Sequence, residues 1–151
     1  MSQSLSKVYL HIIFHIKTTS PTIAKEHIPR LHAYIGQLVK TTGCNVICVG
    51  GIADHVHALV QLTNTETVAH LLEAMKRNSS RWIKTLSHEY DKFAWQGGYA
   101  VFSISQSLVD RTTEYIRRQE EHHEKKSFRD EYLEFLKLYS IEYDERYVLS
   151  D

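Results

Sequence analysis

The order of strand-like and helix-like segments is the feature that most restricts the fold of this chain. Segments rich in β-branched and aromatic residues predict strands, and apolar residues that recur every three or four positions predict amphipathic helices. The predicted segments are, in order, a strand at 8–17, a helix at 25–42, strands at 44–50 and 55–62, a helix at 68–86, and a strand in the second half of 93–105. This β-α-β-β-α-β order is typical of the split βαβ (ferredoxin-like) α+β fold, an antiparallel sheet with helices on one face. We expect the other face to be free for chemistry.

Two further helices are expected after the last strand. Ser107–Asp110 and Ser127–Asp130 both show a capping-box-like pattern, which is typical of a helix start. The first of these helices carries Tyr115 and Gln119 along one side.

Length and composition indicate one soluble domain. The chain has 151 residues, 42% of them hydrophobic and 24% charged, which fits one core and excludes a disordered or fibrous protein. We expect a single domain over 1–151, with its core at about 7–106 and the tyrosine-bearing helix and tail at about 107–151. Neither a signal peptide nor an apolar stretch of about 20 residues is visible, so we expect a cytoplasmic protein with no membrane partner. Cys44 and Cys48 share a predicted strand and are expected to be reduced.

The charge balance gives no long-range attraction to nucleic acids. Eighteen basic and eighteen acidic residues cancel, so a polyanion would need a local basic patch. One group of basic residues lies on a single predicted helix and gives the better candidates for phosphate contacts: Lys76, Arg77, Arg81 and Lys84. A second group, within 117–126, alternates with glutamates and is explained equally well as a solvated helix surface.

The sequence Asp54-His55-Val56-His57 is the sharpest local motif. Alternate residues of a strand project to the same side, so the two imidazoles should lie together while Val56 faces the core. Two histidines are too few for a closed zinc site but suit an open metal site that substrate and water complete. The alternative is that both histidines only hydrogen-bond to their neighbours.

Tyr115 and Gln119 form a second candidate pair. Because the two residues are four positions apart on a predicted helix, we expect their side chains to be stacked on one face. A tyrosine oxygen can attack phosphorus and hold the phosphoryl group as an ester. On pattern alone, however, a tyrosine on an apolar stripe is more often a core residue. His122 and His123 are adjacent and cannot share one helical face, so a joint metal site there is not expected.

Four ordered blocks of the sequence resemble one enzyme family. The blocks are Gly50–Val60, Asn78–Trp82, Tyr115–His123 and Ile141–Tyr147, and they resemble the single-tyrosine HUH transposases of the insertion-sequence type. The resemblance extends from the first strand to the tail. Departures are small: Ala58 stands where a larger aliphatic residue is common, and residues 17–19 lack an arginine often seen there.

The resemblance implies a function for each candidate residue. Tyr115 would be the nucleophile that cleaves single-stranded DNA and becomes joined to the 5′ phosphate, and His55, His57 and Gln119 would bind Mg²⁺ or Mn²⁺. It also implies a homodimer that recognises DNA hairpins at element ends. One alternative is a nucleotide hydrolase with a histidine nucleophile, but Leu59 stands where such enzymes have a third histidine. The other is a domesticated relative that binds hairpins as a regulator without transposition activity.

Overall fold

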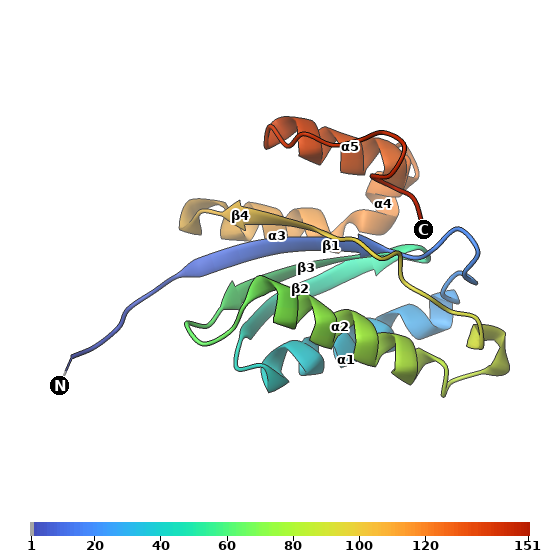
Figure 1. Cartoon of the computed structure of the whole chain (residues 1–151), viewed down its shortest axis with the longest axis horizontal. Helices are drawn as coiled ribbons and strands as arrows, with labels where there is room; N and C mark the ends of the chain where they lie inside the picture. Colours follow the sequence, from blue (N-terminus) through green and yellow to red (C-terminus); the bar gives the residue numbers. More distant parts are fainter. Residues whose placement is uncertain (1) are drawn as a thin grey trace.

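The structure is a computed structural model that describes residues 2–151. Its centre is a four-stranded antiparallel sheet with the strand order β2-β3-β1-β4 (Figure 1). This arrangement confirms the predicted α+β fold. The strands are β1 (Val8–His15), β2 (Asn45–Ile52), β3 (His55–Leu62) and β4 (Ala100–Ile104).

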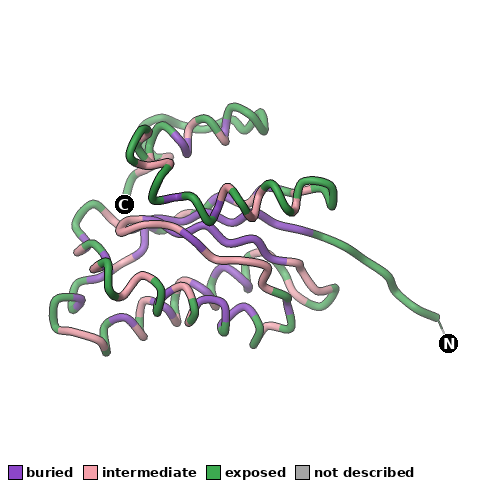
Figure 2. The backbone as a smooth tube through the Cα atoms, turned by 180° about the vertical axis from the view of Figure 1, so that it is seen from behind, coloured by how far each residue is buried: buried purple, intermediate pink, exposed green. Residues whose placement is uncertain are grey.

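Two long helices cover one face of the sheet. Helices α1 (Ile28–Thr41) and α2 (Val68–Ile83) lie side by side below it in Figure 1. Three alternate residues of β1, Leu10, Ile12 and Phe14, join the large core on this side. Because strand residues alternate between faces, the odd-numbered residues of β1 face the other way. Figure 2 shows the buried residues concentrated in the strands and on the inner sides of these helices.

The second face of the sheet is also covered, so the expectation that it is free was wrong. Helices α3 (Val109–Arg117), α4 (Gln119–His123) and α5 (Phe128–Leu138) lie above this face in Figure 1. A small apolar cluster joins α5 to the sheet, in which Tyr132 and Leu136 pack with Ile13, Ala100 and Phe102. The residues of this face are therefore enclosed between sheet and helices. Short 3-10 segments precede α1, β4 and α3, at Lys25–His27, His88–Tyr90 and Gln106–Leu108.

The starts and ends of the last helices differ in part from the sequence prediction. Ser127 caps α5 as expected, since its hydroxyl accepts a hydrogen bond from the Asp130 amide at 3.2 Å. The expected cap at Ser107 is absent: the residue before α3 is Leu108, and the Ser107 hydroxyl contacts that of Ser105 instead. Helix α3 also ends early, at Arg117, so Tyr115 and Gln119 lie on two helices and not on one face of a single helix.

Two further expectations concern the cysteines and membranes. Cys44 is buried and Cys48 is partly buried, and the two are not joined by a disulfide. Within residues 2–151, no helix combines the length and apolar character needed to cross a bilayer.

Candidate active site

Strand β3 delivers both histidines of the motif to the enclosed face. The side chains of His55 and His57 are fully buried there, and Val56 between them belongs to the core beneath α1 and α2. The alternation predicted from the sequence is therefore confirmed. The two rings lie edge to face with their centroids 5.1 Å apart.

Each histidine has a polar partner behind it. Asp54 Oδ1 lies 2.7 Å from Nδ1 of His55, and Nε2 of His11 lies 2.8 Å from Nδ1 of His57. Metal-binding histidines commonly use one ring nitrogen in this way, which fixes the ring and aims the other nitrogen at the ion. Burial lowers the pKa of His57 to about 4 and also lowers that of His11, so both rings are neutral near pH 7. Neutral imidazoles are the form that binds metal ions.

Helix α3 brings Tyr115 to the same place. A glycine in β2, Gly50, lets the helix lie directly on the sheet, because a Cβ there would come within 2.4 Å of the Ile116 carbonyl oxygen. The Tyr115 hydroxyl donates a hydrogen bond to the carboxylate of Glu131. Burial, reinforced by that carboxylate, raises the pKa of Tyr115, so the phenol keeps its proton in the DNA-free protein.

Gln119, at the start of α4, bridges the two halves of the site. Its side-chain oxygen lies 2.9 Å from Nε2 of His55 and 3.0 Å from Nε2 of His123. Its amide nitrogen donates to Glu131 at 3.2 Å. The structure thus brings His55, His57, Tyr115 and Gln119 together, although the route differs from the single helical face that the spacing predicted.

Two residues of the site were not predicted, Glu131 and His123. Glu131 is 2% exposed, and its Oε1 lies 2.9 Å from Nε2 of His57 and 3.3 Å from Nε2 of His123. Nitrogen and oxygen atoms of His55, His57, His123 and Glu131 all lie within 4.8 Å of one another, a group that fits a metal ion. His122 also reaches Glu131, at 3.2 Å, but through the other oxygen. Nothing in the sequence distinguishes Glu131 from the other acidic residues near the tail.

The basic residues predicted on α2 lie elsewhere. Helix α2 is on the opposite side of the sheet from α3 (Figure 1). Lys76 donates to the carbonyl oxygens of Gln96 and Gly98, both at 2.7 Å, and Arg77 pairs with Glu73 at 3.5 Å. Lys76 is thus engaged within the protein, whereas Arg81 and Lys84 are exposed.

The comparison with protein families decides what kind of site this is. The family model described as "Transposase IS200 like" matches residues 4–119. The chain belongs to this family. IS200-like transposases cleave DNA and transfer strands, and they are the single-tyrosine, insertion-sequence type that the sequence blocks resemble. The matched region includes His55, His57, Tyr115 and Gln119 and ends before His123 and Glu131.

Relatives agree with this family and with the fold. ISDra2 transposase TnpA of Deinococcus radiodurans is 22% identical over 114 residues, which are 72% of this transposase and 81% of the relative. A crystal structure assigned as a transposase from D. radiodurans R1 has a TM-score of 0.61 at 19% identity, covering 79% of this chain and 98% of that one. A REP-associated tyrosine transposase bound to a REP hairpin has a TM-score of 0.56 at 11% identity, and the match covers 77% of this chain and 70% of that one. The two solved structures share the fold of this IS200-like transposase.

Proposed function

We propose that this protein cleaves and rejoins single-stranded DNA through a 5′-phosphotyrosine intermediate on Tyr115. One observation carries the proposal: the Tyr115 hydroxyl and the His57 imidazole contact the two oxygens of one carboxylate, that of Glu131. The phenol and the histidine pair are therefore close enough to act on one phosphodiester. A tyrosine in an unrelated part of the core would not meet the histidine motif in this way.

The reaction follows from the chemistry of the phenol. Tyr115 Oη attacks phosphorus, the bond from phosphorus to the 3′ oxygen breaks, and the phosphoryl group stays on the tyrosine as an ester. The Glu131 carboxylate accepts the phenol proton, and the departing 3′ oxygen takes a proton from solvent water. Because the ester retains the energy of the broken bond, a 3′ hydroxyl can reverse the reaction and join strands without ATP.

The residues around the histidine pair fit a divalent cation, Mg²⁺ or Mn²⁺. His55, His57 and Gln119 would hold it, with Asp54 and His11 orienting the two rings. A cation bound there would offset the negative charge that develops on the phosphate oxygens. Carboxamide and carboxylate oxygens beside the imidazoles suit these hard ions.

We further propose that the substrate is single-stranded DNA with hairpins and that the protein acts as a homodimer. The REP-associated neighbour was solved with a hairpin, which supports the choice of substrate. Of the four basic residues predicted as DNA contacts, Arg77, Arg81 and Lys84 remain candidates on the α2 side, whereas the Lys76 ammonium is held by the carbonyl oxygens of Gln96 and Gly98. Three basic residues near the phenol, Arg111, Arg118 and Lys125, line a cavity of about 730 Å³ that also reaches Tyr115.

A covalent adduct tests the proposal. We expect wild-type protein with Mn²⁺ to form an SDS-stable adduct with a pool of hairpin-bearing single-stranded oligonucleotides flanked by randomised bases. Tyr115→Phe should abolish the adduct but keep hairpin binding, and Tyr99→Phe, at a tyrosine that is 41% exposed, is the matched control. An equal yield from Tyr115→Phe would reject the nucleophile. Hairpin binding by the wild type without any adduct would favour the alternative, a hairpin-binding regulator.

A further inference from the structure

Helix α5 inserts a carboxylate into the histidine site from outside the region that the family model matches. Glu131 lies in the first turn of α5, and the match ends at residue 119. Only 2% of the residue is exposed, although carboxylates are rarely buried unless a partner compensates the charge. The apolar contacts of Tyr132 and Leu136 with the sheet hold the helix in this position. The Tyr115 hydroxyl and the Gln119 amide donate hydrogen bonds to this carboxylate, and the remaining groups that face it are histidine nitrogens.

The hydrogen-bond partners of two neighbouring histidines match the arrangement expected around a bound cation. Nδ1 of His123 lies 2.6 Å from the Lys126 carbonyl oxygen, and Nδ1 of His55 faces the Asp54 carboxylate, so each Nδ1 must carry the ring proton. In a neutral ring, Nε2 is then an acceptor. Both Nε2 atoms nevertheless face the side-chain oxygen of Gln119, which is also an acceptor.

Rotating the Gln119 amide does not remove this conflict. The rotated side chain would turn its oxygen toward Glu131 Oε2, which now accepts from the Gln119 nitrogen at 3.2 Å. The rotation would remove the two unfavourable contacts between the Gln119 oxygen and the histidine Nε2 atoms, but it would create an unfavourable contact between the Gln119 oxygen and Glu131 Oε2. A positive ion between the nitrogen and oxygen lone pairs satisfies all of them at once.

The spacing of the atoms around Glu131 fits ligands of a single ion. Neighbouring ligands at about 2.1 Å from an octahedral ion lie about 3.0 Å apart. Glu131 Oε1 lies 2.9 Å from Nε2 of His57, 3.3 Å from Nε2 of His123 and 3.8 Å from Nε2 of His55. The second oxygen, Oε2, stays in contact with Tyr115.

We infer that Glu131 is a ligand of the metal ion in the DNA-free protein, so that metal binding and the docking of α5 depend on each other. The inference rests on the proposed function, from which it takes the metal site. The carboxylate gives an otherwise neutral set of donors a negative charge, which strengthens binding of a divalent ion. Any ion that needs α5 in place also stabilises α5 in place, because linkage is reciprocal.

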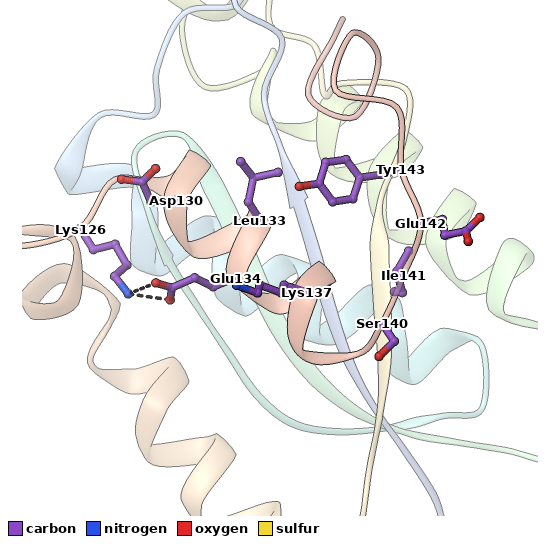
Figure 3. Close-up of a pocket in the computed structure, with 9 residues that line it drawn as sticks. All are labelled: Lys126, Asp130, Leu133, Glu134, Lys137, Ser140, Ile141, Glu142 and Tyr143. Carbon is purple, nitrogen blue, oxygen red and sulfur yellow. Dashed lines mark hydrogen bonds and ion pairs between the residues drawn. The ribbon is translucent and has the colours of Figure 1, made fainter.

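The inference is tested by metal binding to the full chain without DNA. The variants are Glu131→Gln and a control one turn further along α5, Glu134→Gln. Figure 3 shows Glu134 turned toward Lys126, and Lys126 Nζ lies 2.6 Å from both carboxylate oxygens of Glu134. Glu134 lines a cavity of about 620 Å³ that neither His55 nor His57 lines. Free Mn²⁺ is measured by electron paramagnetic resonance. We expect Glu131→Gln to bind Mn²⁺ at least about tenfold more weakly than wild type, and Glu134→Gln to bind it as wild type does.

Amide hydrogen exchange supplies a second measurement on the same proteins. Mn²⁺ should slow exchange in residues 128–138 of the wild type and of Glu134→Gln, but not of Glu131→Gln. Equal Mn²⁺ affinity in all three proteins, or no effect of Mn²⁺ on exchange in α5, would overturn the inference. These outcomes are separate from the proposed transesterification, which fails if the wild type forms no DNA adduct or if Tyr115→Phe forms as much adduct as the wild type.

Discussion

Gly50 lies in β2 beneath helix α3, where the helix leaves no room for a side chain. A Cβ at this position would be 2.4 Å from the Ile116 carbonyl oxygen and 2.7 Å from Ile116 Cγ2. Carbon–oxygen contacts are normally about 3.3 Å long, so Gly50→Ala must push α3 away from the sheet by about 0.9 Å. The neighbouring Tyr115 moves with the helix. A misplacement of about 1 Å at a reacting group can reduce the rate about 100-fold.

The expected result for Gly50→Ala is a folded but poorly active protein. Overpacking of this kind costs about 1–3 kcal/mol of stability, measured by urea unfolding. The rate of the tyrosine–DNA adduct should fall by one to two orders of magnitude under conditions where the variant remains folded. Gly97→Ala is the control, because a Cβ there meets nothing within 4 Å. If Gly50→Ala matches the control within about twofold in rate, contact between α3 and β2 does not position Tyr115.

Three other perturbations have defined outcomes. His57 and Tyr115 of the same chain meet at Glu131, so a mixture of the His57→Ala and Tyr115→Phe proteins should form no adduct; recovery of the adduct in the mixture would show active sites shared between subunits. Burial lowers the pKa of His32 to about 4, so the unfolded chain takes up a proton that the folded chain does not as pH falls from 6.5 toward 4. His32 should contribute up to about 1.4 kcal/mol per pH unit to the loss of stability there, in addition to the share of the other buried histidines, and His32→Asn should reduce the slope in urea unfolding by that amount. Ser127→Ala should cost about 1 kcal/mol through loss of the α5 cap, measured by the same assay, and an unchanged stability would show that the cap contributes nothing.

The sheet could be predicted because its information is local. Strand β3 has the bounds that the sequence predicts, 55–62, and the two-residue alternation alone placed His55 and His57 on one face. The order of segments was then enough to give the fold class. The same reasoning wrongly predicted that the second face of the sheet is free, because the sequence of a strand does not indicate which later helices pack on it.

The rest of the site depends on contacts between distant segments. The break at Arg118 changes the direction of the chain, so Tyr115 and Gln119 meet the histidines from two helices. Glu131 is 74 residues from His57 and was indistinguishable from the solvent-exposed acidic residues around it. Its burial is a consequence of how Tyr132 and Leu136 dock on the sheet, which is a tertiary effect. Local patterns therefore identified His55, His57, Tyr115 and Gln119, which the structure brings together, but not the complete set of groups around them.

The covered face also restricts how DNA can reach the phenol. Removing α5 would expose Tyr132 and Leu136, at a cost of about 1.5–3 kcal/mol for each buried side chain. The cavity beside α3 offers a path without that cost, because Tyr115 itself lines it together with Arg111 and Lys125. Tyr115 lines this cavity and Glu131 does not, so a phosphodiester that entered there would meet the phenol before the carboxylate. In the proposed reaction the phosphate also has to approach the histidine pair, whose Nε2 atoms lie 2.9 and 3.8 Å from Glu131 Oε1, so the Glu131 side chain would have to move aside.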